Sequence, residues 1–372
     1  MEYVKLEEIC TIVSGGTPSR SKPNYWNNGN IPWIKIKDMK SKYIDSAEEF
    51  ITEEGLNNSS TKMLKRDTIL YSIFATLGEV GILKIDACTN QAIAGLSLKE
   101  DSNILKEYLY YYLKSKKKDV NNLGRGVAQN NINLSLLRKF KIPVIPLRQQ
   151  KKIIEVLDNV SSTINNYERE LALLDELVKA RFVEMFGRPT DKITRYPKVK
   201  IGNLIKEGKA SIKAGPFGSS LKKEFYVKKG FKIYGQEQVI KNDPTFGDYY
   251  INEDRFNSLK SCEVHAGDIL ISLVGTCGKT MIMPENFEPG IINPRLLKIA
   301  FDAEFIIPIY FKYFFGSDDL QKILNSASGH STMNVVNAGM LKNVELIMAP
   351  IELQNQFASF VEEVDKSKEV RI

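Results

Sequence analysis

The sequence contains few of the residues that form metal centres, disulfides and histidine-based catalytic sites. Its 372 residues include two histidines, His265 and His330, and four cysteines, and no two cysteines form a C-x-x-C pair. Zinc ligation and disulfides are therefore not expected, and we predict a reducing, cytoplasmic environment. With so few histidines, no Ser/His/Asp or Cys/His set can be nominated for nucleophilic catalysis.

Long apolar runs are also lacking. No segment approaches the roughly 18 consecutive apolar residues that a membrane helix requires. Residues 1–8 are rich in glutamate and lack the apolar stretch of a signal peptide. We therefore expect no contact with a membrane.

Phosphate-binding and cofactor-binding motifs are incomplete. Residues 275–280 (GTCGKT) resemble the end of a P-loop, but Leu273 stands where that motif requires its first glycine. No G-x-G-x-x-G turn occurs, and residues 243–246 (DPTF) lack the second proline of the Asp-Pro-Pro-Tyr signature of amino-methyltransferases. The sequence therefore nominates no catalytic residue, no metal site and no cofactor of its own.

The chain does contain a long internal repeat. Residues 70–78 (LYSIFATLG) return as 270–278 (LISLVGTCG), and residues 142–150 (IPVIPLRQQ) return as 346–354 (LIMAPIELQ). The offset between the copies stays between 195 and 204 residues. A period of this length indicates duplicated domains, because the units of a solenoid are much shorter. We place the two domains at residues 1–146 and 189–350.

Each copy is predicted to be an α+β domain, from short apolar segments separated by turn residues. The first copy is expected to have strands at 31–36, 68–73, 80–85 and 92–98, and a helix over 104–118 that Asn103 caps. The second is expected to have strands at 231–234, 269–274, 280–283 and 296–299, and a helix near 305–324. The aromatic runs 110–112 and 313–315 are expected to pack in the cores.

Positive charge is concentrated in the two copies. The net charge is +5 over residues 1–146 and +4 over 191–350, but zero over 147–190 and −2 over 351–372. A surface that binds phosphates needs this sign, because neutralising phosphates releases counterions. A mildly basic protein with no nucleic-acid partner would show the same charge, so charge alone leaves both interpretations open.

Residues 147–188 predict a long helix with one apolar stripe. Apolar residues recur at alternating spacings of three and four from residue 153 to 185, interrupted only by Arg181. Such a stripe requires a partner helix, and residues 351–372 begin a similar one. We expect the two helices to form an antiparallel coiled coil that separates the domains. The predicted contact residues are Ile153, Leu157, Val160, Ile164, Tyr167, Leu171, Leu174, Val178 and Met185 in the first helix, and Phe357, Val361 and Val364 in the second.

Loops in both copies carry residues suited to DNA. Hydroxyls, amides and cations bind phosphate oxygens, while Asn and Gln can read adenine and Arg can read guanine. Each residue could instead be a polar residue that forms a turn. The candidates in the first copy are Thr17, Ser19, Arg20, Lys22, Lys35, Lys37, Arg125, Gln129, Asn130 and Asn131. Those in the second are Lys213, Ser219, Ser220, Lys222, Lys223, Gln236, Lys279, Arg295, His330 and Ser331.

The first copy resembles a known DNA-reading module. Residues 4–6 (VKL), 14–18 (SGGTP) and 31–34 (IPWI) are similar to the opening of a target recognition domain of a type I restriction-modification specificity (S) subunit. Residues 142–153 (IPVIPLRQQKKI) resemble the end of that domain and its entry into a conserved helix. The resemblance covers essentially the whole chain. It implies that each domain reads one half of a split double-stranded DNA target, and that the helices set the gap.

The same resemblance implies partners. Two methyltransferase (M) subunits would dock on the S subunit, and motor-nuclease (R) subunits would join for cleavage. S-adenosylmethionine, ATP and Mg²⁺ would belong to those partners, and this chain would be non-catalytic.

Two other functions stay open on the residues alone. One is a self-sufficient DNA methyltransferase or nuclease with degenerate motifs, which the missing cofactor turn argues against. The other is a duplicated scaffold whose ligand is not nucleic acid.

The unequal lengths of the two helices predict an exposed face. Antiparallel pairing would place the residues after Pro350 beside Phe186 and end the second helix opposite Ile164. Ile153, Leu157 and Val160 would then have no partner within the chain. An exposed apolar stripe usually marks an interface, so we expect a methyltransferase subunit, or the same stripe of a second S chain, to cover it.

Overall fold

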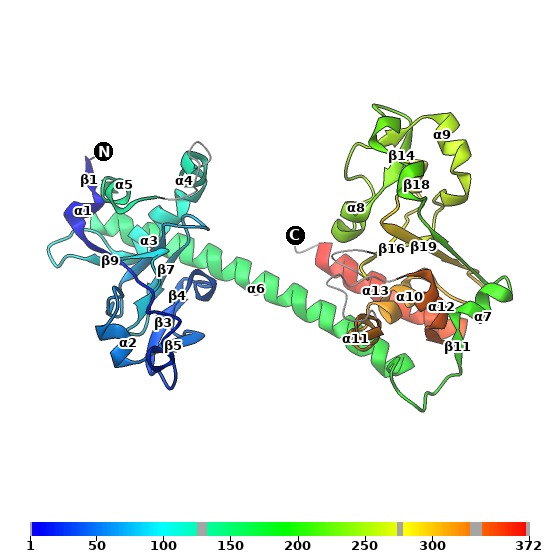
Figure 1. Cartoon of the computed structure of the whole chain (residues 1–372), viewed down its shortest axis with the longest axis horizontal. Helices are drawn as coiled ribbons and strands as arrows, with labels where there is room; N and C mark the ends of the chain where they lie inside the picture. Colours follow the sequence, from blue (N-terminus) through cyan, green and yellow to red (C-terminus); the bar gives the residue numbers. More distant parts are fainter. Residues whose placement is uncertain (1, 125–131, 274–277, 328–336, 370–372) are drawn as a thin grey trace. The chain divides into compact units, whose positions relative to one another are not determined.

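The computed structural model describes residues 2–124, 132–273, 278–327 and 337–369. The chain divides into two compact units, Met1–Asn166 and Tyr167–Ile372, which we call unit 1 and unit 2. The division falls within helix α6 (Leu147–Phe186), so each unit contains one copy of the repeat and part of this helix (Figure 1).

Unit 1 consists of short strands and short helices. The strands are β1 (Glu2–Lys5), β2 (Cys10–Ser14), β3 (Ile31–Ile34), β4 (Tyr43–Ile44), β5 (Glu49–Ile51), β6 (Ile69–Ser72), β7 (Val80–Leu83), β8 (Cys88–Thr89), β9 (Ile93–Leu98) and β10 (Lys141–Val144). The helices before α6 are α1 (Leu6–Ile9), α2 (Glu53–Asn57), α3 (Lys106–Ser115), α4 (Lys117–Gly124) and α5 (Leu134–Arg138), with 3-10 turns η1 (Pro23–Tyr25) and η2 (Ile36–Asp38).

Unit 2 repeats this series. Its strands are β11 (Lys198–Lys200), β12 (Ala210–Ala214), β13 (Tyr226–Val227), β14 (Phe231–Tyr234), β15 (Tyr250–Ile251), β16 (Ile269–Ser272), β17 (Thr280–Ile282), β18 (Gly290–Ile292), β19 (Leu296–Phe301) and β20 (Glu345–Ile347). Its helices after α6 are α7 (Ile201–Lys206), α8 (Gln236–Lys241), α9 (Glu253–Ser258), α10 (Pro308–Phe315), α11 (Asp318–Ala327), α12 (Ala338–Asn343) and α13 (Ile351–Glu369). The 3-10 turns are η3 (Gly218–Ser220), η4 (Lys223–Phe225) and η5 (Lys260–Cys262).

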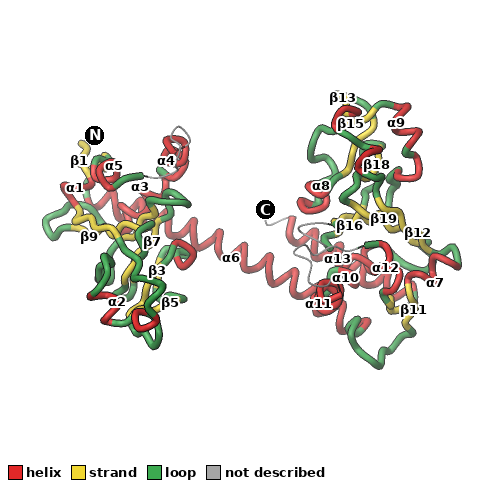
Figure 2. Tube along the Cα trace, viewed as in Figure 1, coloured by secondary structure: helices red, strands yellow, loops and turns green. Residues whose placement is uncertain are grey.

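Both units combine short strands with helices (Figure 2). They share one sheet plan: the main sheet has the order β2-β9-β6-β7 in unit 1 and β12-β19-β16-β17 in unit 2, and unit 1 adds β4 at its edge. A second sheet contains a parallel pair in both units, β3 with β8 and β14 with β18. A two-stranded antiparallel sheet brings together the beginning and end of each copy, β1 with β10 and β11 with β20. The predicted α+β class and the duplication are both confirmed.

The predicted strands are present, with ends that differ by a few residues. The strands β6 and β16 are buried along their whole length. Their sequences are therefore apolar runs rather than alternating patterns, because neither face meets water. The aromatic runs lie in the cores as expected, since Tyr110, Phe314 and Phe315 are buried.

The prediction of one long helix per copy was wrong, because each helix is broken. In unit 1, α3 ends at Ser115 and α4 begins at Lys117; in unit 2, Gly316 and Ser317 separate α10 from α11. The expected cap was also wrong: Leu105 is the N-cap residue of α3. Asn103 instead presents its backbone carbonyl to a buried glutamine from α6.

That glutamine, Gln150, joins the first turn of α6 to its domain. Its side chain is completely buried. The Leu105 N–H donates to Gln150 Oε1 at 2.8 Å, and Gln150 Nε2 donates to the carbonyls of Asn103 at 2.7 Å and Ile145 at 2.8 Å. We call this arrangement the glutamine clamp.

Unit 2 contains the same clamp at Gln354, in the first turn of α13. The Ile307 N–H donates to Gln354 Oε1 at 3.0 Å, and Gln354 Nε2 donates to the carbonyls of Phe305 and Ala349, both at 2.9 Å. Gln354 is also completely buried. The repeated Pro-x-x-x-Gln sequence at 146–150 and 350–354 thus encodes a repeated joint between domain and helix.

In unit 2, α13 pairs antiparallel with the second half of α6. The Phe357 ring lies 5.4 Å from the Phe182 ring and 5.6 Å from the Phe186 ring. Further along α13, the Lys368 ammonium lies 2.7 Å from the Asp175 carboxylate. The predicted direction is confirmed, but the predicted register was wrong: it ended the second helix opposite Ile164, whereas Lys368, close to the last described residue of α13, meets Asp175.

The predicted contact residues of the helices fall into two groups. In unit 2, the buried or packed ones are Leu174, Val178, Met185, Phe357, Val361 and Val364, whereas Leu171 is half-buried and Tyr167 is exposed. In unit 1, Ile153, Val160 and Ile164 are 38%, 50% and 52% exposed, and Leu157 is half-buried.

The clamp predicts a large stability difference between two adjacent glutamines. Gln150→Leu should lower the free energy of unfolding by roughly 2–5 kcal/mol, because the Leu105 N–H and two carbonyls lose their buried partner. Gln149→Leu, one residue earlier and exposed, should change it by less than about 0.5 kcal/mol. Urea unfolding of the two variants would measure the difference, and equal midpoints would contradict the role of the clamp.

Candidate nucleic-acid interface

In unit 1, the loop after β2 is fixed to the sheet by its two glycines. The Gly15 N–H donates to the Ile93 carbonyl at 3.0 Å, and the Gly16 N–H donates to the Thr89 carbonyl at 2.9 Å. A Cβ atom on Gly15 would lie 2.2 Å from the Asn90 carbonyl oxygen. Only glycine allows this close approach, so residues 15–22 leave the sheet in a defined direction.

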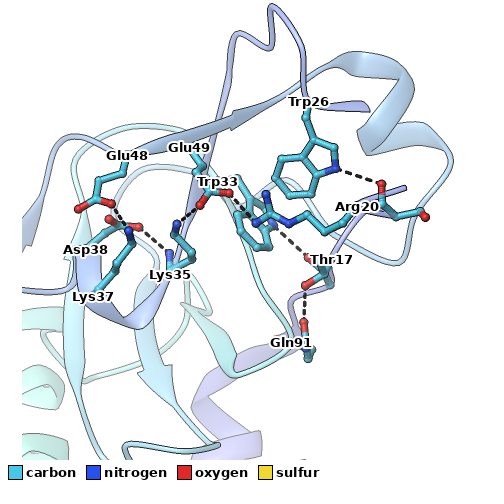
Figure 3. A network of polar contacts seen from close by, with 12 residues as sticks. Thr17, Arg20, Trp26, Trp33, Lys35, Lys37, Asp38, Glu48, Glu49 and Gln91 are labelled. Atoms are coloured by element: carbon cyan, nitrogen blue, oxygen red, sulfur yellow. Dashed lines mark hydrogen bonds and ion pairs between the residues drawn. The ribbon is translucent and has the colours of Figure 1, made fainter. Parts of the chain in front are cut away.

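The only two tryptophans of the chain hold this loop from one side (Figure 3). Trp33 Nε1 donates to the Gly16 carbonyl at 3.0 Å, and Trp26 Nε1 donates to the Ser19 carbonyl at 3.1 Å. The two rings meet edge to face, with centroids 5.0 Å apart. The loop is therefore pre-organised by two rigid side chains, which lowers the entropy that binding would cost.

Arg20 lies on this aromatic pair. Its guanidinium carbon is 3.6 Å from the Trp26 ring centroid and 5.0 Å from the Trp33 centroid. Its Nη2 atom is 2.5 Å from Glu49 Oε2. A guanidinium stacked on an indole in this way keeps its plane fixed, which favours bidentate hydrogen bonding.

Three of the predicted DNA-contacting cations, Arg20, Lys35 and Lys37, each face a carboxylate. Lys35 shares Glu49 with Arg20, and Lys37 pairs with Glu48 (Figure 3). Partial burial would raise the pKa of the Glu49 carboxyl, but hydrogen bonds from Lys35 and Arg20 hold this pKa below its usual value. The cations are thus oriented and partly neutralised, a feature that sequence reasoning missed because Glu48 and Glu49 come from the neighbouring strand region.

Three further unit 1 candidates lie along the same loop. Thr17 is hydrogen-bonded to Gln91, Ser19 Oγ lies 2.8 Å from Ser21 Oγ, and Lys22 Nζ donates to the Tyr25 hydroxyl at 2.9 Å. Glu49 thus brings Arg20 and Lys35 together, while Thr17, Ser19 and Lys22 lie on the loop that carries Arg20. Whether they contact DNA stays a prediction.

Unit 2 presents the equivalent loop with different side chains. The Gly215 N–H donates to the Leu296 carbonyl at 3.0 Å, and a Cβ atom on Gly215 would lie 1.8 Å from the Asn293 carbonyl oxygen. The predicted residues of this loop, Lys213, Ser219, Ser220, Lys222 and Lys223, are exposed or, for Ser220, half-exposed. Lys279 and Arg295 are exposed as well, and half-buried Gln236 is the first residue of α8.

A buried lysine supports a further loop of unit 2 that the sequence did not single out. Lys232 is 1% exposed, and its ammonium donates to the Thr245 carbonyl at 2.9 Å and to Glu288 Oε1 at 2.6 Å. Gln238 Nε2 also donates to the Phe246 carbonyl at 2.9 Å. These bonds fix residues 243–246 (DPTF), the segment with an incomplete methyltransferase signature.

Several candidates lie outside the described residues: Arg125, Gln129, Asn130, Asn131, His330 and Ser331. Among the residues that the structure describes, no group of three or more His, Cys, Asp or Glu side chains is placed to hold a metal ion. None of the helices described here is both long and apolar enough to span a membrane.

Comparison with known families decides what this duplicated scaffold is. The family model of the type I restriction modification DNA specificity domain matches the chain twice, at residues 1–175 and 207–371. The chain belongs to this specificity family. The two matches fall on the two copies of the internal repeat, so each copy is one specificity domain.

Relatives within the specificity family cover the chain to different extents. The specificity subunit of EcoR124I/EcoR124II from Escherichia coli is 34% identical over 188 residues, which are 49% of this chain and 46% of that protein. The MjaVIII specificity subunit of Methanocaldococcus jannaschii is 20% identical over 388 residues, which cover 100% of this chain and 87% of that protein. The chain thus spans less than half the length of the first relative and most of the second.

Solved structures of the specificity family share the fold. A chain from a study of complex assembly and conformational transition of the type I R-M system superimposes with a TM-score of 0.58 at 15% identity, covering 100% of this chain and 92% of that one. The S subunit from M. genitalium superimposes with a TM-score of 0.51 at 15% identity, covering 100% and 90%.

The ion pairs at Glu49 predict a pH dependence. Folding lowers the pKa of the Glu49 carboxyl. The stabilisation from this carboxylate is therefore complete above its unfolded pKa of about 4.3, and it is lost as the pH falls through the lower pKa of the folded state. Carboxyl NMR titration should give a midpoint for Glu49 below about 4.3, and Arg20→Gln should move it upward. Lys37→Gln, which removes the partner of Glu48, should leave the Glu49 midpoint in place. An unchanged Glu49 midpoint in Arg20→Gln would contradict the pairing.

Proposed function

We propose that the chain is the DNA sequence-specificity subunit of a type I restriction-modification complex, and that each unit reads one half of a two-part DNA target. The observation that carries this proposal is the duplicated match to the specificity domain. Two domains with one scaffold suit a target that presents two sites.

The two units would read different sequences, because their equivalent loops carry different side chains. Gly15 and Gly215 mark equivalent positions, since both pack against the carbonyl of an asparagine, Asn90 or Asn293. Two residues later the chain has Thr17 in unit 1 and Phe217 in unit 2. The aromatic support differs too, because Arg20 stacks on Trp26 while Arg255 stacks on Phe225 at 3.6 Å.

Phosphate contacts would supply most of the sequence-independent affinity. Both repeated regions carry net positive charge, and Lys22, Lys222 and Lys223 are exposed beside the loops. In unit 1, Glu48 and Glu49 orient cations that phosphate oxygens could share. Contacts of this kind position the protein on the duplex, whereas contacts to base edges provide the sequence specificity.

Catalysis would belong to partner subunits. We assign S-adenosylmethionine to two methyltransferase subunits, and ATP and Mg²⁺ to motor-nuclease subunits. The apolar face of α6 in unit 1 supports a docking site, because Ile153, Val160 and Ile164 are each more than a third exposed. Exposed apolar stripes of this kind are typical of protein interfaces, and we propose that a methyltransferase subunit covers this one.

Exchange of one unit tests independent reading. Replacing residues 1–146 with the same region of another specificity subunit should change one half of the methylated sequence and preserve the other. The physical reason is that each recognition loop is fixed to the sheet of its own unit. Sequencing of methylated DNA would measure this, and a change in both halves at once would contradict the proposal.

A charge on the exposed face of α6 tests the docking site. Val160→Asp should weaken assembly with the methyltransferase by roughly tenfold or more, because an unpaired carboxylate would be buried in the interface. Asn159→Asp, at the preceding exposed position, carries the same new charge and should assemble nearly normally. Light scattering of the mixed subunits would report both. Normal assembly of Val160→Asp would contradict docking here, and dissociation of a chain dimer by this variant would assign the face to a second copy instead.

A further inference from the structure

Unit 2 exposes a phenylalanine at the tip of its recognition loop. Phe217 is 87% exposed, although its neighbour Pro216 is buried and Leu221 is 5% exposed. A phenyl ring left in water forgoes the free energy that burial would provide. The exposure of this ring therefore calls for a partner outside the described chain.

The loop holds Phe217 in a fixed position. Before it, Gly215 donates its N–H to the Leu296 carbonyl at 3.0 Å. After it, the Ser220 N–H donates to the Phe217 carbonyl at 2.8 Å, and the Leu221 side chain packs into a core cluster with Ile233 and Ile251. The ring is thus presented by a backbone that is anchored on both sides, so binding would cost little loop entropy.

The surroundings of Phe217 favour a nucleic acid over a protein. Lys213 is exposed in β12 just before the loop, and Lys222 and Lys223 are exposed just after its tip, where the Lys222 ammonium lies 3.6 Å from the exposed carboxylate of Glu224. Lysine is depleted from the cores of protein interfaces, whereas lysines around an apolar tip match a phosphate backbone around stacked bases. A Cβ atom on Gly218 would have no neighbour within 4 Å, so this side of the tip leaves room for a close backbone approach.

Resting on the proposed function, we infer that Phe217 inserts against a base pair within the half-site that unit 2 reads. An aromatic or apolar wedge can partly unstack a base step, and lysines on either side can hold the flanking phosphates. Thr17 occupies the equivalent position of unit 1, so the wedge belongs to one half-site only.

The equivalence also supplies a variant that the fold accepts. Phe217→Thr places at this position the residue that unit 1 carries there, and the side chain is exposed, so folding should be preserved. Ile193→Thr is the matched control, because Ile193 is 93% exposed in unit 2 but outside the recognition loop. Phe217→Trp should retain the wedge.

The test uses the chain assembled with its methyltransferase partner and duplexes that carry the mapped target. A fluorescent adenine analogue, 2-aminopurine, is placed at successive positions in each half-site. The wild type should raise the fluorescence at one position of the unit 2 half-site, and Phe217→Thr should abolish this rise and weaken binding by about tenfold or more. Ile193→Thr and Phe217→Trp should behave like the wild type.

A double-change experiment locates the contact. If Phe217 contacts the unit 2 half-site, Phe217→Thr should cost less affinity on a duplex altered in that half-site, and its full cost should remain on a duplex altered in the other half-site.

Equal affinity and fluorescence for the wild type and Phe217→Thr would overturn the inference, as would an equal loss of affinity on every duplex. Failure of the wild-type complex to prefer its mapped target would instead overturn the proposed function.

Discussion

A single buried amide joins each recognition domain to its helix, and the geometry of the rest of each unit depends on it. Gln150 and Gln354 each satisfy one backbone N–H and two backbone carbonyls with the same three hydrogen bonds. The backbone N–H, the two backbone carbonyls and the oxygen and nitrogen of the glutamine amide would each be costly to bury without a hydrogen bond. The joint therefore has one favoured arrangement. It connects the last strand of each copy, β10 or β20, to the helix that follows, α6 or α13.

Each unit combines a rigid sheet with a loop whose side chains differ between the two copies. The first glycine of the loop makes the same kind of bond to the sheet in both units, Gly15 to Ile93 and Gly215 to Leu296, while the residues that follow differ. In unit 1 two tryptophans, Arg20 and Glu49 form a polar network, and in unit 2 an exposed phenylalanine takes the equivalent place. Conserved anchoring with variable side chains is how one fold can read unrelated sequences, because binding residues on loops can change without disturbing the core.

Much of this organisation could be predicted from the sequence, because it repeats. The strands, the two α+β domains and the antiparallel direction of the helices follow from apolar patterns that are local or duplicated. The helix register could not be predicted, because apolar spacing indicates which face of α13 packs but not which residues of α6 lie opposite it. The pairing of Arg20 and Lys35 with Glu49 was missed for a similar reason: cross-strand ion pairs depend on a register that the sequence leaves unspecified. Trp26 and Trp33 could have been singled out from the sequence, because they are its only two tryptophans.

The central claim is that one chain carries two unlike DNA readers. Mapping of methylated adenines in a genome, with this chain as the only specificity subunit beside its methyltransferase, tests it most directly. The account predicts one methylated sequence of two different halves, separated by an unspecified gap of fixed length. A single uninterrupted motif, two identical inverted halves, or no dependence of methylation on this chain would contradict it.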